Sequence, residues 1–277
     1  MNLVLQSPFI NQSDVDALAG VTRASSVEAL SATAFRLKGA SAHDSVAKLC
    51  EARRLDFAWM PDGRRFADLK LLAMDMDSTL ITIECIDELG AIAGKGAEIA
   101  AITAAAMRGE IADYKESLKR RVALLAGQSE TALERVYQDK LRLTPGAEQL
   151  VAACRKHNVK TLLVSGGFAF FTERLKARLG LDYTLSNSLE IEHGRLTGRL
   201  LGDIVDAQAK ADEFSSVLKK LKIGKDESVA IGDGANDLKM MAAAGVSVAF
   251  RAKPVVRAQA GCALTYSGLD GVLNLFE

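Results

Sequence analysis

The residues best suited to chemistry in this chain are carboxylates that follow short apolar runs. Asp75 and Asp77 stand two positions apart in DMDST, directly after the apolar residues 71–74. In an extended chain, residues two apart point to the same face, so both carboxylates converge. Such a pair is costly unless a cation or a shared proton compensates it. The pattern fits one nucleophilic and one proton-transferring carboxylate, although a solvated or helix-capping pair of aspartates would look the same.

A second acidic group follows another apolar run, at residues 229–231. It is GDGAND, which contains Asp233, Asn236 and Asp237 among glycines that let the backbone turn sharply. Hard oxygen donors in this number suit Mg²⁺. A simple Gly/Asn/Asp turn is the competing interpretation. The two acidic groups together, on separate strands, favour a metal-assisted site.

Two further features could hold a phosphate. Ser165 and Gly166 belong to an SGG segment between an apolar run and a helical segment, where free backbone N–H groups and one hydroxyl could cradle an anion. Lys210 could place a positive charge on phosphoryl oxygens. Each feature alone is weak, because tight turns and surface lysines are common.

The pattern of apolar runs predicts the elements that must position these residues. Short continuous apolar runs suit strands that are covered on both faces, and they alternate here with helical segments, which predicts a doubly wound parallel α/β sheet. Ligand sites in such sheets lie at the carboxyl ends of the strands. The predicted strands are 71–74, 161–164, 229–231 and 246–250. The predicted helices are 146–158, 168–179, 207–221 and 236–244.

Two other regions flank this pattern. An insert at about 84–143 has helical periodicity and lacks proline, which predicts a small helical cap over the sheet edge. Residues 1–68 predict an N-terminal βαββαβ module of ferredoxin-like type, and 69–277 a catalytic domain that contains the cap. Within the module we expect strands near 2–6, 21–25, 33–37 and 57–60, and helices from 11–13 onward and at 43–54.

Composition excludes several classes of function. The chain has 277 residues, with 35 basic and 35 acidic side chains, so no broad charge attracts nucleic acid or an anionic membrane. The four cysteines are scattered, which is typical of reduced thiols. No apolar run is long enough to span a membrane, and the N-terminus lacks the pattern of a signal peptide. We therefore expect a soluble cytoplasmic protein.

The motifs occur in the order DMDST, SGG, Lys210 and GDGAND, which resembles the haloacid dehalogenase-like phosphohydrolase superfamily over about residues 71–277. DMDSTLITIECIDELG, YKESLKRRVALLAG, VSGGF and GDGANDLKMM are similar to the phosphoserine phosphatases within it. The resemblance implies Mg²⁺-dependent hydrolysis of O-phosphoserine, the last step of serine biosynthesis. The N-terminal module by itself resembles the ligand-binding ACT type, and three roles remain open for it: formation of a homodimer, binding of serine, and bracing of the catalytic domain.

The resemblance assigns roles to single residues. Asp75 would be the nucleophile that becomes aspartyl-phosphate, and Asp77 the general acid and base. Asp75, the backbone carbonyl of Asp77, and Asp233 would bind Mg²⁺, with Asp237 in support. The phosphoryl oxygens would be held by Ser165, Gly166 and Lys210, with Asn236 bordering the site.

The cap would choose the substrate. By resemblance, Glu84 faces the substrate ammonium and Arg121 binds its carboxylate, a match that a planar guanidinium makes with two hydrogen bonds. The choice of Arg121 over the neighbouring Arg120 for this role rests only on the spacing of the family motif. Two alternatives stay open: a phosphatase or phosphotransferase for another small phosphomonoester, and a regulatory amino-acid-binding protein.

Overall fold

The computed structural model describes residues 1–108, 110–111 and 113–277, and its largest element is a seven-stranded sheet. The strand order is β11-β10-β9-β5-β6-β7-β8, and neighbours are parallel except for the antiparallel pair β7–β8. The strands are β5 (Leu71–Met74), β6 (Lys160–Phe168), β7 (Tyr183–Glu192), β8 (Arg195–Leu201), β9 (Ser228–Gly232), β10 (Val246–Phe250) and β11 (Cys262–Leu264). A mostly parallel α/β sheet is therefore confirmed.

Helices cover both faces of this sheet. Side chains alternate along each strand, so Leu71 and Ala73 enter one apolar cluster and Leu72 and Met74 enter another. The first cluster contains residues of helices α9 (Ala207–Leu221) and α10 (Leu238–Ala243). The second contains residues of helices α7 (Ala147–Lys156) and α8 (Ala169–Leu179). This burial on both faces explains why the strands are continuous apolar runs in the sequence.

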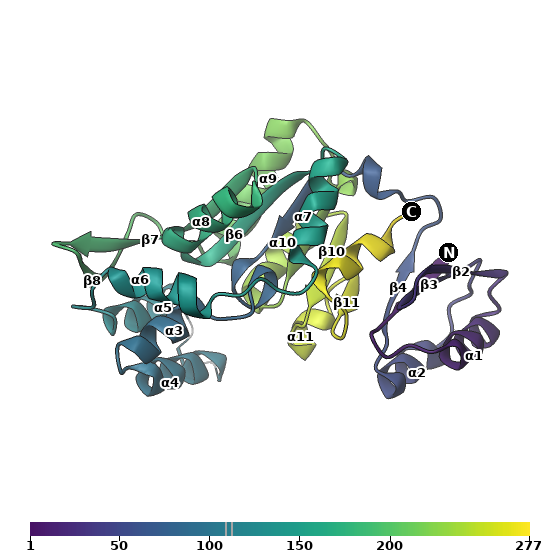
Figure 1. Cartoon of the computed structure of the whole chain (residues 1–277), viewed down its shortest axis with the longest axis horizontal. Coiled ribbons are helices and arrows are strands. Elements are labelled where there is room, and N and C mark those ends of the chain that lie inside the picture. Colours follow the sequence, from purple (N-terminus) through teal and green to yellow (C-terminus); the bar gives the residue numbers. More distant parts are fainter. Residues whose placement is uncertain (109, 112) are drawn as a thin grey trace.

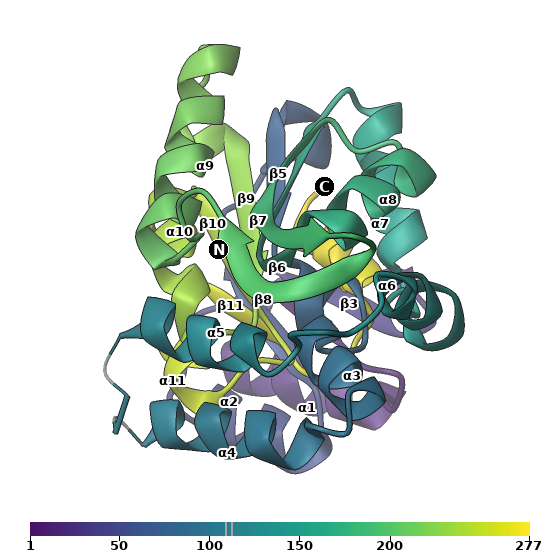
Figure 2. The same ribbon diagram turned by 90° about the vertical axis from the view of Figure 1, so that its left-hand side faces the viewer.

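The predicted insert at 84–143, between β5 and α7, folds as helices, as its periodicity predicted. These helices gather below the β7–β8 hairpin in Figure 2, beside one end of the sheet. They are α3 (Cys85–Ile92), α4 (Gly96–Met107), α5 (Tyr114–Ala123) and α6 (Thr131–Arg135), which continues into a π-helical turn at Val136–Lys140.

Sequence reasoning missed the β7–β8 hairpin, which braces the insert. Strand β8 packs on helix α5, and Gly198 allows the close approach, because a methyl group there would lie 2.9 Å from the Ala126 side chain. The two strands join through His193 and Gly194, both with positive φ. A Gly-containing two-residue turn between β-rich segments was the signal that could have revealed the hairpin.

The N-terminal region forms a separate four-stranded antiparallel sheet of order β2-β3-β1-β4. Its elements are β1 (Asn2–Gln6), α1 (Gln12–Thr22), β2 (Ser26–Ser31), β3 (Ala34–Lys38), α2 (Ser45–Arg53) and β4 (Asp56–Met60). The predicted strand at 21–25 is wrong. Helix α1 continues to Thr22, whose hydroxyl bonds to the Leu18 carbonyl, and Arg23 ends it in the left-handed conformation.

Polar contacts fix the small sheet against the end of the chain (Figure 1). The buried Asp56 carboxylate accepts backbone N–H bonds from Thr265, Tyr266 and Ser267 at 2.7–3.2 Å. Asn2 donates to the carboxylate of Glu277, so the two termini are neighbours. In the described part of the chain, no helix is long and apolar enough to cross a membrane.

Candidate active site

The carboxyl ends of the central strands meet at a cavity of about 680 Å³. Asp75 follows β5, Ser165 and Gly166 lie near the end of β6, and Asp233 follows β9. Parallel strands end at the same edge of a sheet, which is why residues far apart in sequence converge there. Asn236 lines the same cavity.

A buried lysine joins two of the acidic residues. The Lys210 ammonium lies 2.7 Å from a carboxylate oxygen of Asp75 and 2.7 Å from one of Asp237, and its side chain is fully inaccessible to solvent. Burial alone would lower the pKa of Lys210, but the charges of Asp237 and Asp75 outweigh it and raise that pKa. Lys210 is therefore a fixed positive charge, and the surface-lysine interpretation is wrong.

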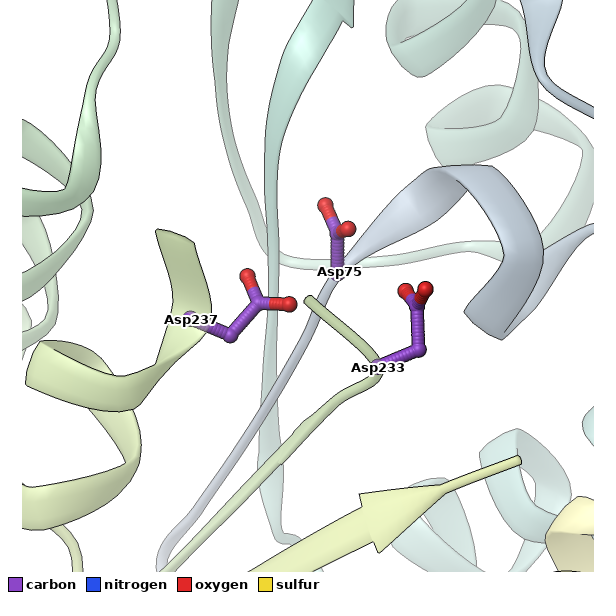
Figure 3. A group of neighbouring side chains, drawn as sticks. All are labelled: Asp75, Asp233 and Asp237. Atoms are coloured by element: carbon purple, nitrogen blue, oxygen red, sulfur yellow. The ribbon is translucent and has the colours of Figure 1, made fainter. Parts of the chain in front are cut away.

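Three carboxylates converge beside this ammonium. Figure 3 shows Asp75 and Asp233 at the ends of their strands and Asp237 reaching towards them from the start of α10, with oxygens of all three within 4.8 Å of one another. Burial, and then the charge of Asp237, raises the pKa of Asp75 well above its usual range and that of Asp233 to about 6. Three carboxylates against one ammonium leave an excess of negative charge, so these residues fit a divalent cation.

Asp77 occupies a different environment from Asp75. One of its oxygens accepts the Cys85 backbone N–H at 2.8 Å, and the other accepts the Ser165 hydroxyl at 3.3 Å. Burial raises the pKa of Asp77, while the bonds from Cys85 oppose the rise. Ser78, directly after Asp77, has a φ of 56°, so the backbone turns through the left-handed conformation at this point.

The SGG segment precedes helix α8, as predicted, but strand β6 extends through it to Phe168, so the predicted strand end at 164 is wrong. The pairing of β6 with β7 shifts between Val164 and Phe168, which leaves the segment irregular, and helix α8 begins only at Ala169. The Ser165 hydroxyl accepts the Gly167 N–H at 2.8 Å. A methyl group at Gly167 would lie 2.6 Å from an Asp77 oxygen, so only glycine fits there.

Glu84 and Arg121 line the cavity from the insert. Glu84 accepts the Ser78 hydroxyl at 2.7 Å, and burial, followed by the charge of Asp77, raises its pKa to about 7. The structure distinguishes the two adjacent arginines. Arg120 forms an exposed ion pair with Glu116, whereas Arg121 is half-buried against the cavity.

Three residues near the site escaped the sequence reasoning. The Thr79 hydroxyl donates to Asp233 at 3.1 Å, and Lys253 and Tyr114 line the cavity. Lys253 belongs to RAKP, directly after strand β10, so its place after a strand at the same sheet edge was the signal. Tyr114 comes from the insert, and only the packing of α5 brings it to the strand ends.

These features agree with one family of known proteins. The haloacid dehalogenase-like hydrolase family matches residues 72–242. The chain belongs to this family. It is therefore a hydrolase, as its motifs predicted. A domain of unknown function, DUF4072, matches residues 3–46.

Individual relatives narrow the comparison. A phosphoserine phosphatase of Polaromonas is 54% identical over 77% of this chain and 92% of its own length. The crystal structure of a probable phosphoserine phosphatase from Vibrio cholerae, 36% identical, covers 99% of this chain and 86% of that one with a TM-score of 0.86. A phospho-aspartyl intermediate analogue of phosphoserine phosphatase is 34% identical over 76% of this chain and 99% of its own, with a TM-score of 0.71. The predicted relation to phosphoserine phosphatases is confirmed.

Proposed function

We propose that this chain hydrolyses O-phosphoserine to serine and inorganic phosphate, with Mg²⁺ as its cation and Asp75 as the residue that carries the phosphoryl group. One observation carries the proposal. A single cavity is lined by Asp75 and Asp77 on the sheet and by Glu84 and Arg121 on the insert. The first pair suits a phosphate ester, and the second offers opposite charges to an ammonium and a carboxylate.

The first half of the reaction transfers the phosphoryl group to the enzyme. An oxygen of Asp75 attacks phosphorus, the bond between phosphorus and the seryl oxygen breaks, and Asp77 gives that oxygen its proton. The raised pKa of Asp77 suits this role. The ammonium of Lys210, 2.7 Å from Asp75, reduces the repulsion between the attacking carboxylate and the phosphoryl oxygens.

The second half returns the enzyme to its starting state. Asp77, now ionised, removes a proton from water, whose oxygen attacks phosphorus and releases the Asp75 carboxylate with inorganic phosphate. Asp75, Asp233 and the Asp77 carbonyl, with Asp237 in support, would hold Mg²⁺, which would supply charge neutralisation at the phosphoryl oxygens. The raised pKa of Asp75 supports a need for such a cation, because an ionised nucleophile requires more positive charge than Lys210 provides.

The experiment is release of phosphate from phosphoserine, phosphothreonine, phosphoethanolamine, 3-phosphoglycerate and phosphoglycolate, each with Mg²⁺ and with EDTA. Asp75→Asn is the matched inactive control, because it keeps the shape of the side chain but lacks a nucleophilic carboxylate. We expect Mg²⁺-dependent turnover of phosphoserine far above the other esters. Preference for another ester would refute the substrate, and turnover by Asp75→Asn would refute the nucleophile.

We further propose that residues 1–68 form an ACT-like α+β module joined to a catalytic domain at 69–277 with its cap at about 84–143. The βαββαβ order and the antiparallel sheet support this division. The outer strand β2 carries half-exposed and exposed residues along its length, which makes it a candidate surface for a homodimer. A monomeric mass in light scattering would refute that role.

We place the enzyme in the cytoplasm, at the last step of serine biosynthesis.

A further inference from the structure

Helix α5 presents one face to the cavity, and Tyr114 begins that face. Tyr114, Ser117, Leu118 and Arg121 all line the cavity, and their spacing of three, four and seven residues places them on one side of the helix. Arg121 lies two turns beyond Tyr114. One helix face can therefore reach two ends of a small ligand.

The Tyr114 hydroxyl meets the sheet at Gly166. A methyl group at Gly166 would overlap the hydroxyl oxygen and lie 3.3 Å from the ring carbon that bears it. The tyrosine ring packs against the main apolar cluster, so the hydroxyl is held in place. This contact joins the insert to strand β6, at the segment proposed to hold phosphoryl oxygens.

The hydroxyl is a hydrogen-bond donor that lacks an acceptor among residues 1–108, 110–111 and 113–277. Burial raises the pKa of Tyr114, so the phenol keeps its proton at neutral pH, and the charges that act on it are those of Lys210, Arg121, Asp75 and Asp77. Tyr114 is partly buried and lines the cavity, so its hydroxyl is available to a ligand there. Here the remaining neighbour is the cavity itself.

Resting on the function proposed above, we infer that the Tyr114 hydroxyl donates a hydrogen bond to a phosphoryl oxygen of the bound ester, beside Gly166. The bond ties the insert to the sheet whenever a phosphoryl group is present. Helix α5 thus contacts both ends of the substrate, with Tyr114 at the phosphoryl group and Arg121 at the carboxylate.

The test is Tyr114→Phe in the full chain, with binding of inorganic phosphate measured by calorimetry in the presence of Mg²⁺. Loss of a hydrogen bond to a charged acceptor should weaken phosphate binding roughly 10-fold or more. Binding of L-serine, which lacks the phosphoryl group, should change less than about twofold. Tyr137→Phe, at a partly buried tyrosine of the same insert, is the control and should bind phosphate like the parent.

Three results would overturn the inference. Equal phosphate affinity in the parent and in Tyr114→Phe would show that the hydroxyl makes no such bond. Weakened serine binding with unchanged phosphate binding would assign the hydroxyl to the other end of the substrate. A parent protein that binds no phosphate would refute both this inference and the proposed function. Parent protein that binds phosphate but does not hydrolyse phosphoserine would refute the proposed substrate alone.

A second variant pair probes the contact by sterics. Gly166→Ala should weaken phosphate binding, because its methyl group displaces the Tyr114 hydroxyl. Adding Tyr114→Phe removes the overlapping oxygen and leaves the ring carbon at 3.3 Å. The double variant should therefore bind phosphate more tightly than Gly166→Ala alone. Losses that multiply, instead of partly cancelling, would contradict the contact.

Discussion

Replacing Lys210 by methionine tests whether the buried ammonium holds the site together. The ammonium contacts Asp75 and Asp237 at 2.7 Å and is shielded from solvent. Methionine preserves most of the apolar stem, so the packing loss is small. Removing one partner of a buried ion pair costs about 3–5 kcal/mol, because the other charge stays buried and uncompensated. Two carboxylates lose their partner here, so we expect the upper part of that range.

The assay is urea unfolding followed by circular dichroism at pH 7 in EDTA. With a slope of roughly 3 kcal/mol per M, a loss of about 4–5 kcal/mol lowers the midpoint by about 1.3–1.7 M. Lys239→Met is the matched control, because Lys239 is on the surface and donates to the exposed Gln208. Its midpoint should stay within about 0.2 M of the parent.

The pH dependence of the Lys210→Met defect sharpens the test. Without the ammonium, burial keeps the folded pKa of Asp75 raised, as it already is in the parent. A carboxyl group with a raised folded pKa contributes stability at low pH and loses it as pH rises through that pKa. The defect should therefore shrink at pH 5 and grow towards pH 8. A defect below about 1 kcal/mol, or one that is constant with pH, would refute the buried-charge argument.

Four further predictions concern the substrate end, the cation and the joint between the sheets. Arg121→Lys should raise KM for phosphoserine about tenfold, because lysine cannot make the bidentate contact with the substrate carboxylate. The control Arg120→Lys should leave KM within about twofold of the parent. Equal effects of the two substitutions would contradict the assignment. Burial raises the pKa of Glu84 to about 7, so Glu84 loses its negative charge as pH drops below 7. The preference for phosphoserine over 3-phosphoglycerate, which carries a hydroxyl in place of the ammonium, should then fall, as measured by the ratio of the two kcat/KM values. A ratio that does not change with pH would show that Glu84 does not bind the ammonium. EDTA should abolish turnover and Mg²⁺ restore it. Asp56→Ala orphans backbone N–H groups and should lower the free energy of unfolding by about 2–4 kcal/mol, with activity retained after refolding; an unchanged unfolding curve would refute the role of Asp56.

Much of the scaffold could be predicted from local patterns. The predicted strands 71–74 and 246–250 and the helix 207–221 have the bounds that the structure gives them. A strand that is buried on both faces requires a continuous apolar run, and a helix that is buried on one face requires apolar residues with a period of 3.6. Both patterns can therefore be recognised from the sequence alone. Because parallel strands end at one edge, the convergence of Asp75 and Asp233 followed directly from their positions after strands.

Other features depended on which faces pack together. The sequence could not separate Arg121 from Arg120, since both belong to one amphipathic helix, and only the packing of α5 turns Arg121 to the cavity. Nor could it reveal that Lys210 is buried between two carboxylates from other elements, or that Tyr114 meets Gly166. Periodicity specifies a direction within one element, whereas contacts between distant elements arise only when the whole core is assembled.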